Sequence, residues 1–265
     1  MTALDYTLSM TPGSVEADAL FSRMTVQPDQ DRRAAIMTLI ATLKAAGIWA
    51  RFDGFYVMAA HTSQAARLNW VADRYNLTAV AGPIFTPNRG YQGDGAAAYL
   101  DTGLSLTTPG LNYQRSSAHM GIWSLTHLDG TMIDMGVRQA GNVNSSFVTA
   151  RYAGSVAITA INAGSGFSAG NPTNVGHFVG VRSAETTLAA YKDSALLGTS
   201  AQSSAGVSVQ SPTVPIAAGK TGGLVSSYSA RQYAAAHIGG ALTAVEISRL
   251  HAALQTYLAI VGAAA

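Results

Sequence analysis

Short apolar runs separated by turns dominate the chain from Leu77 onward. Runs rich in Val, Ile, Thr, Tyr and Phe alternate with Gly, Asn, Pro and Ser at intervals of roughly ten residues. This spacing is typical of antiparallel sandwiches and jelly rolls, whose short strands are joined by tight turns. One hairpin is predicted to turn at Asp193 and Ser194. The predicted strands are 77–80, 97–101, 117–126, 131–138, 146–152, 155–161, 176–182, 187–192, 213–217 and 233–238.

The region before Leu77 favours helices. Pro28 suits a first helical position, and Asp29 and Asp31 place negative charge near the amino end of the helix dipole. The apolar residues that follow recur with the i, i+3, i+4, i+7 spacing of one buried helix face, and Gly47 is a natural terminator. These apolar residues are Ile36, Leu39, Ile40 and Leu43.

An aromatic-rich run at 48–60 and the segment 61–73 continue this pattern, so residues 1–75 are predicted to form a helical block. The block has two interpretations. It attaches the protein to a particle through its aromatic side chains, or it packs the same apolar face on the sandwich. The candidate attachment residues are Trp49, Phe52, Phe55 and Tyr56.

A closing helix is predicted at 243–258. Thr243 and Glu246 stand in the Thr-x-x-Glu relation of a capping box, which satisfies two backbone amides that would otherwise lack partners. The expected fold class is therefore mainly β. We expect an antiparallel two-sheet jelly-roll sandwich at 76–265, with the helical block before it and the closing helix at its end.

Composition excludes several classes of protein. The chain has no cysteine, so a disulfide framework, a thiolate metal site and a cysteine nucleophile are all ruled out. Its 16 basic residues are scattered and the formal net charge is +2, so no nucleic-acid partner is expected. No stretch approaches the ~20 apolar residues of a membrane-spanning helix, and no membrane insertion is expected.

The low content of charged residues and the amino-terminal sequence each lead to one further expectation. Charged residues make up 11% of the chain, against about 25% in an average soluble domain. A surface so poor in charge suits a member of an assembly, and a homo-oligomer is predicted. The opening segment MTALDYTLSM lacks the basic and apolar regions of a secretory signal. We therefore expect synthesis in the cytoplasm without a signal peptide.

Three segments together resemble the concanavalin A-like (laminin G-like) jelly-roll domains. GYQGDGAAAYLDTG (90–103) resembles the entrance strands of those domains. HFVGVRSAETTLAAYKDSALLGTS (177–200) resembles their central hairpin, with Ser194 in place of the usual glycine. ARQYAAAHIGGALTAVEISRLHAAL (230–254) resembles their last strand and the short helix after it. This fold hosts lectins, glycosidases and inert scaffolds alike.

The segment 39–95 is similar to the lead-in of virion proteins from bacteriophages, prophages and gene-transfer particles, of the tail-fibre, head-fibre or receptor-binding type. This resemblance implies a virion-surface protein that binds host glycans without catalysis. Its partners would be other virion proteins and a bacterial surface polysaccharide. The alternative is a purely structural decoration or adaptor protein, and the third possibility is a glycoside hydrolase or esterase.

The sequence does not favour the hydrolase possibility. Glycosidase chemistry needs carboxylates that converge on the scissile bond, about 5 to 5.5 Å apart in retaining enzymes. The chain has three glutamates, and no predicted strand contains an acid-x-acid pair. Residues 166–170 match Gly-x-Ser-x-Gly, with Asp193 and His237 following in hydrolase order. That motif needs a helix directly after Ser168, whereas Asn171 and Pro172 indicate a turn, so a glycine-rich loop is predicted.

No metal site or cofactor is indicated by a motif. The six histidines show no ligand spacing, so each is predicted to be a packed or surface imidazole. Some laminin G-like domains bind Ca²⁺ in rim loops, and Asp94, Asp101 or Asp129 could serve such a site. Isolated aspartates in glycine-rich turns more often cap the backbone.

A glycan site requires amides or carboxylates for sugar hydroxyls and an aromatic ring for the C–H face of the sugar. RQAGNVN (138–144), with Tyr152 on the next strand, and FSAGNPTN (167–174) have that content. Asn and Gly also form turns without any ligand, which is the competing interpretation. The candidate glycan-binding residues are Arg138, Asn142, Asn144, Tyr152, Phe167, Asn171 and Asn174.

Overall fold

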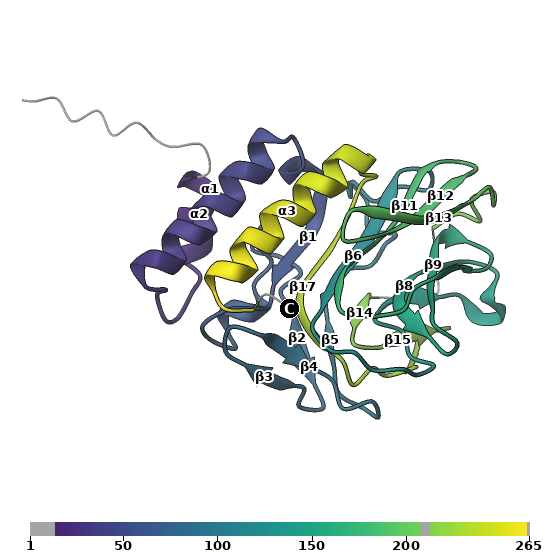
Figure 1. Ribbon diagram of the computed structural model, residues 1–265, viewed down its shortest axis with the longest axis horizontal. Helices are drawn as coiled ribbons and strands as arrows, with labels where there is room; N and C mark the ends of the chain where they lie inside the picture. The colour runs from purple at the N-terminus through teal and green to yellow at the C-terminus, as the bar shows by residue number, and fades with distance from the viewer. Residues whose placement is uncertain (1–13, 208–212, 264–265) are drawn as a thin grey trace, which may run out of the picture.

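Two β-sheets packed face to face form the body of the molecule, and helices cover one outer face (Figure 1). The computed structural model describes residues 14–207 and 213–263. Within these ranges sheet A has eight strands and sheet B has nine. A side chain added at Gly180 of sheet A would collide with Thr159 and Val148 of sheet B, which shows how closely the two sheets pack. The predicted two-sheet, mainly β sandwich is confirmed.

Sheet A has the strand order β13-β12-β11-β6-β17-β4-β3, and β1 also pairs with β17. Its strands are β1 (Phe52–Val57), β3 (Ile84–Thr86), β4 (Gly90–Gln92), β6 (Ala118–Ser124), β11 (Gly176–Ala184), β12 (Thr187–Lys192), β13 (Ala195–Ser200) and β17 (Gln232–Gly239). All of these pairings are antiparallel.

Sheet B has the strand order β10-β9-β8-β7-β14-β5-β2, with β15 and β16 paired at its side. Its strands are β2 (Thr78–Val80), β5 (Tyr99–Asp101), β7 (Met135–Arg138), β8 (Ser145–Tyr152), β9 (Val156–Ala163), β10 (Phe167–Gly170), β14 (Pro215–Ile216), β15 (Gly219–Thr221) and β16 (Leu224–Ser226). The pairing of β15 with β7 is parallel, and the other pairings are antiparallel.

Each of the ten predicted strands overlaps a strand of the structure, and β12 has the predicted bounds. The predicted hairpin joins β12 to β13. Its turn residues Asp193 and Ser194 have φ of 48° and 70°, so both lie in the left-handed region. Ser194 therefore takes over the backbone conformation that glycine would adopt most easily.

Both helices that the sequence predicts with a clear start signal are present, but Pro28 precedes the N-cap of the first one and is not its first helical residue. Helix α2 (Gln30–Ala45) has Asp29 as its N-cap, which accepts a hydrogen bond from the Arg32 amide, and Gly47 follows it with φ of 72°. Helix α3 (Ala244–Ile260) begins with the complete capping box of Thr243 and Glu246. The two helices lie side by side on the outer face of sheet A, and α1 (Ser14–Phe21) packs against α2 (Figure 1).

The helical prediction for 48–73 is wrong. After a short 3₁₀ helix (Trp49–Arg51), the run becomes strand β1 and pairs with β17. Every residue of β1 is buried. A strand covered on both faces has a continuous apolar run, which periodicity alone cannot distinguish from a buried helix. The segment 61–73 contains one more 3₁₀ turn, Ala65–Arg67.

Three of the four aromatic residues proposed for attachment lie in the interior of the protein. Phe52, Phe55 and Tyr56 are buried, and Trp49 is half-buried with its ring 6.0 Å from that of Phe55. The block thus packs on the sandwich, as the second interpretation expects, and its attachment to a particle stays a prediction. Among residues 14–207 and 213–263, no helix has the length and apolar character to cross a bilayer.

Candidate functional site

Part of the predicted glycan set lies around the connection between β7 and β8. The Arg138 guanidinium lies 4.4 Å from the centre of the Phe147 ring, and burial lowers the pKa of Arg138. Asn144 is buried. Asn142 ends the 3₁₀ turn Ala140–Asn142, and its side chain lies outside the described residues.

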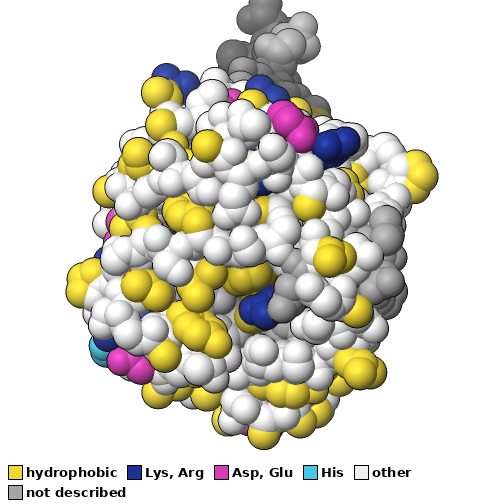
Figure 2. All heavy atoms as spheres, turned by 90° about the vertical axis from the view of Figure 1, so that its right-hand side faces the viewer, with side chains coloured by type: hydrophobic (Ala, Val, Ile, Leu, Met, Phe, Trp, Pro, Cys, Tyr) yellow, Lys and Arg dark blue, Asp and Glu magenta, His cyan; other side chains and the backbone are white. Residues whose placement is uncertain are grey.

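Tyr152, one of the two aromatic candidates, ends strand β8, and Asn144 precedes the start of that strand. The Tyr152 side chain is close enough to Arg138 to raise the pKa of that residue, which opposes the effect of burial. Phe167 packs against the hydrophobic core where β10 approaches Gly198 of β13. Figure 2 shows the side of the molecule that lies to the right in Figure 1, where β9 of sheet B and β13 of sheet A lie, with scattered hydrophobic side chains and few charges. The predicted set is thus distributed over the β7–β8 connection, the end of β8 and strand β10, and its role in glycan binding stays a prediction.

Asn171 and Asn174 serve the fold. Both are buried, and their amide nitrogens donate to the backbone carbonyls of Ala150 and Leu128. The Asn174 side-chain oxygen also accepts the Leu128 amide at 3.0 Å. These amides bind turns to strands, which agrees with the competing interpretation that Asn forms turns here.

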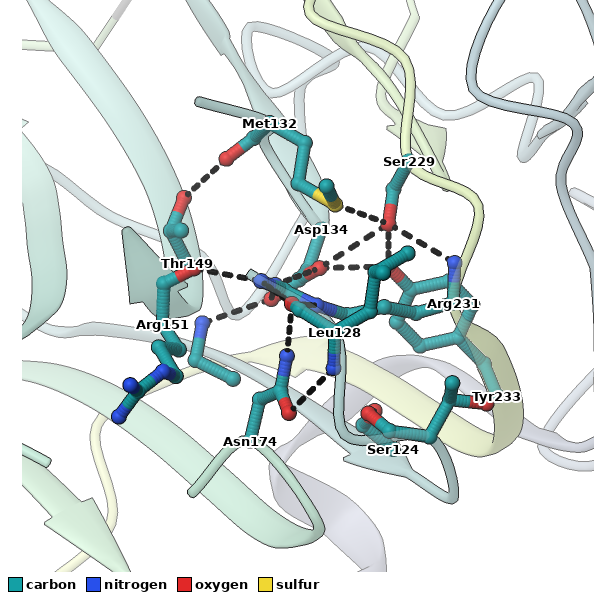
Figure 3. Close-up of polar contacts among 12 residues, drawn as sticks. Ser124, Leu128, Met132, Asp134, Thr149, Arg151, Asn174, Ser229, Arg231 and Tyr233 are labelled. Atoms are coloured by element: carbon teal, nitrogen blue, oxygen red, sulfur yellow. Dashed lines mark hydrogen bonds and ion pairs between the residues drawn. The ribbon is translucent and has the colours of Figure 1, made fainter. Parts of the chain in front are cut away.

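A charged centre that the sequence did not reveal lies beneath these turns (Figure 3). Asp134 and Arg231 are fully buried and form an ion pair, with Arg231 Nη1 2.7 Å from Asp134 Oδ1 and 2.9 Å from Oδ2. The Tyr233 hydroxyl donates to the same carboxylate at 2.5 Å. Arg231 also donates to the backbone carbonyls of Leu128 and Arg151.

This centre holds the fold together. Burial, followed by the nearby Asp134 charge, raises the pKa of Tyr233 well above its usual value, so the phenol stays protonated and remains a hydrogen-bond donor. No side chain of the trio reaches the surface. The only signal in the sequence was the presence of charged residues within apolar segments, such as Asp134 in TMIDMGV.

The residues of the hydrolase-like motif are spread over different parts of the structure. Ser168 lies on β10, at an edge of sheet B, in place of the predicted glycine-rich loop. Residues 167–170 pair with β9, which draws the glycine-rich segment into the sheet. His237 lies buried on β17 of sheet A, where its Nε2 is 2.8 Å from His177 Nε2. The serine and histidine therefore cannot act together in this arrangement.

The three aspartates considered for calcium already have partners. Asp94 accepts three backbone amides at 2.8 Å, and these bonds lower its pKa to about 2. Asp101 accepts Lys220 Nζ at 2.6 Å, and Asp129 pairs with Arg151. In the part of the chain that the structure describes, no group of three or more His, Asp or Glu side chains could hold a metal.

A candidate site with polar and aromatic lining is a cleft beside the start of α3, on the outer face of sheet A. Its floor comes from alternate residues of three neighbouring strands. Val181, Ala189 and Thr199 are register partners across β11, β12 and β13. Because Gly180 faces sheet B, its neighbour Val181 faces outward, toward the layer that contains α3.

One aromatic ring and several hydroxyls line this floor. Tyr191 of β12 is half-exposed, and Ser183, Thr187 and Thr199 are exposed. Within residues 14–207 and 213–263, the structure shows no hydrogen bond from these four hydroxyls to the protein. They are therefore free to bind a ligand.

The wall of the cleft is formed by residues 241–244 and 246, at the start of α3, and by Arg51. Arg51 is half-exposed and lies 3.8 Å from the Glu246 carboxylate. The cleft has a volume of about 400 Å³, within the usual range for small-molecule sites. The cleft therefore combines an aromatic ring, several hydroxyls, a guanidinium and a carboxylate, which are the groups that a sugar-binding site requires.

Comparison with known proteins supports the fold. No family model and no curated protein matches the chain. A structure of botulinum neurotoxin type C, reported to interact with two ganglioside molecules, is similar with a TM-score of 0.54 and 10% identity, over 80% of this chain and 53% of that one. A Trypanosoma rangeli sialidase complexed with 2,3-difluorosialic acid has a TM-score of 0.50 and 14% identity, over 78% and 33%.

A mutant of the Trypanosoma rangeli sialidase that displays trans-sialidase activity has a TM-score of 0.50 and 13% identity, over 85% of this chain and 39% of that one. The chain thus spans about half the length of the neurotoxin chain and less of the sialidases. At these identities the likeness concerns the fold alone.

The cleft was not predicted from the sequence. Its floor residues are ordinary strand residues, and only the register of β11, β12 and β13 brings their hydroxyls together. A weak signal was available in the alternation of Thr187, Ala189 and Tyr191, which places all three on one face of a strand. Nothing local in the sequence shows that the residues before α3 form a wall beside that face.

Proposed function

We propose that this protein binds carbohydrate without catalysis and is displayed on the surface of a virion. The observation that carries the carbohydrate proposal is the cleft, in which the Tyr191 ring lies among unpaired hydroxyls and the Arg51–Glu246 pair. The virion setting rests on the resemblance of residues 39–95 to virion proteins. The bound glycan would be a bacterial surface polysaccharide.

The arrangement of the cleft matches what a sugar ring requires. A sugar ring presents an apolar C–H face, which packs on an aromatic ring, and an edge of hydroxyls, which pair with polar side chains. Tyr191 supplies the aromatic surface, while Ser183, Thr187 and Thr199 supply donors and acceptors. The report of ganglioside interaction for a neurotoxin chain of similar fold also supports a carbohydrate ligand.

Removing the aromatic surface should abolish most of the binding. We expect Tyr191→Ala to weaken binding to an array of bacterial surface polysaccharides by about tenfold or more, because ring stacking and burial of its C–H face are lost. Single sites should bind in the roughly micromolar to millimolar range, with several copies on a particle providing avidity.

Two matched variants control this experiment. Tyr191→Phe keeps the ring and should bind like the wild type. Truncation of the loop residues Tyr152, Asn142 and Asn144 tests the site predicted from the sequence. Equal binding by Tyr191→Ala and wild type, with loss in the loop variant, would move the glycan site from the cleft to the loops of sheet B.

A structural decoration or adaptor role is the second candidate, and one feature favours it. Between α2 and α3 runs an apolar groove of about 520 Å³, whose lining includes Leu39, Thr42, Ala252 and Tyr257. Ala252 is exposed, so Ala252→Arg would fill the groove without entering the core. For an adaptor, this variant should fail to assemble into particles. Under our proposal, particles carrying it should assemble and adsorb normally, whereas those carrying Tyr191→Ala should not adsorb.

A further inference from the structure

We infer that the cleft beside α3 accepts neutral sugars and rejects acidic ones, and that Glu246 is the residue that sets this preference. The inference rests on the proposed carbohydrate function and goes further by naming the class of glycan. It depends on how the charges at the wall of the cleft are arranged.

The start of α3 would otherwise attract anions. Helix α3 has 17 residues, and its first amides and dipole place positive charge at the wall of the cleft. Arg51 adds a full positive charge nearby, with half of its side chain exposed. With no other group present, this end of the cleft would favour a carboxylate, sulfate or phosphate on the sugar.

The carboxylate of Glu246 itself occupies the position at which an anion would bind. Its Oε2 accepts the Thr243 amide at 2.7 Å, and its Oε1 lies 3.8 Å from Arg51. Only 14% of the Glu246 side chain is exposed, so solvent screens its charge less than that of a surface residue. An acidic sugar at this wall would meet a fixed carboxylate beside Arg51 and would be repelled by its charge.

The same arrangement suits neutral hydroxyls. Within the described ranges the Arg51 side chain makes no hydrogen bond to the protein, and its contact with Glu246 is long for a direct bond. Its N–H groups can therefore donate to sugar hydroxyls, while Glu246 Oε1 can accept from them. A donor and an acceptor side by side complement two neighbouring hydroxyls, and the pair carries no net charge.

The test compares wild type with Glu246→Gln on an array that holds neutral bacterial polysaccharides and polysaccharides rich in uronic or nonulosonic acids. Glutamine at this position still completes a capping box, so the helix start is retained. We expect the wild type to prefer neutral polysaccharides. The ratio of acidic to neutral binding should rise about tenfold in the variant, because the negative charge at the anion position is removed.

Glu16→Gln is the matched control, because it changes the net charge equally on α1, away from the cleft. A gain in acidic binding by both variants would assign the effect to overall charge and overturn the inference. A wild-type preference for acidic polysaccharides would also overturn the inference, and so would an unchanged binding profile in Glu246→Gln. In both of these cases the proposed carbohydrate function would stand. Absence of binding by wild type and both variants would instead overturn the carbohydrate function, and the inference with it.

Discussion

Asp134→Asn should lower the free energy of unfolding by about 3 to 5 kcal/mol, because it leaves the Arg231 charge buried without a counter-ion. Both side chains are fully buried, so water cannot solvate the remaining cation. The Tyr233 hydroxyl would lose the same carboxylate as its acceptor. Urea unfolding followed by circular dichroism would measure the change.

Glu185→Gln is the matched control for this prediction. Glu185 also pairs with an arginine, Arg115, but the Glu185 and Arg115 side chains are 49% and 62% exposed. Exposed ion pairs contribute roughly 0 to 1 kcal/mol, so the control should remain close to wild type. A similar small loss in both variants would show that the Asp134–Arg231 pair does not stabilise the sandwich.

Mild acid should destabilise the interface between α3 and sheet A. His119, His177 and His237 are fully buried there, and His251 of α3 stacks on Trp123 and His177. Burial lowers the pKa of His177 to about 3 and that of His119 to about 4, and lowers the pKa of His237 well below its usual value. Two nearby carboxylates oppose the effect of burial without reversing it. Glu246 raises the pKa of His119, and Asp193 raises the pKa of His251.

The sign follows from proton binding. Between pH 6.5 and the lowered pKa values, the unfolded chain binds protons that the folded chain does not, so stability falls as the pH falls. Each such imidazole should remove about 2 kcal/mol of stability between pH 7 and pH 5. The loss should be complete near the folded pKa values, around pH 3 to 4.

Urea unfolding at pH 7 and pH 5 tests this effect. His177→Phe should lose about 2 kcal/mol less than wild type across that interval, since it removes one buried titrating group. His127→Phe changes an exposed imidazole and should keep the wild-type pH dependence. Identical pH dependence in the wild type and both variants would show that the buried histidines do not control acid stability.

The sequence predicted those parts of the fold that depend on local signals. Turn residues and runs rich in strand-forming residues predicted ten strands, and each of them overlaps a strand of the structure. Thr243 and Glu246 correctly predicted the start of α3. Strand β1 was mistaken for helix because it is buried on both faces and has lost the alternation of a half-exposed strand. β10 was read as a loop because its glycine and serine content resembles a turn.

The candidate site was much less predictable, because it depends on contacts between distant segments. Asn171 and Asn174 had the composition of a sugar site, but their partners Ala150 and Leu128 lie more than twenty residues away in the chain. The cleft combines residue 51 with strands near 180–200 and with the start of α3. Only the sheet register and the placement of α3 bring these segments together.

The central claim is that the cleft beside α3 binds sugar. The most direct measurement is a titration of ¹⁵N-labelled protein, followed by amide chemical shifts, with the neutral oligosaccharide that binds best on the array. Our account predicts shifts concentrated in residues 187–191, 199 and 241–246, and their absence in Tyr191→Ala. Shifts confined to residues 138–144 and 152, or no shifts at saturating oligosaccharide, would contradict it.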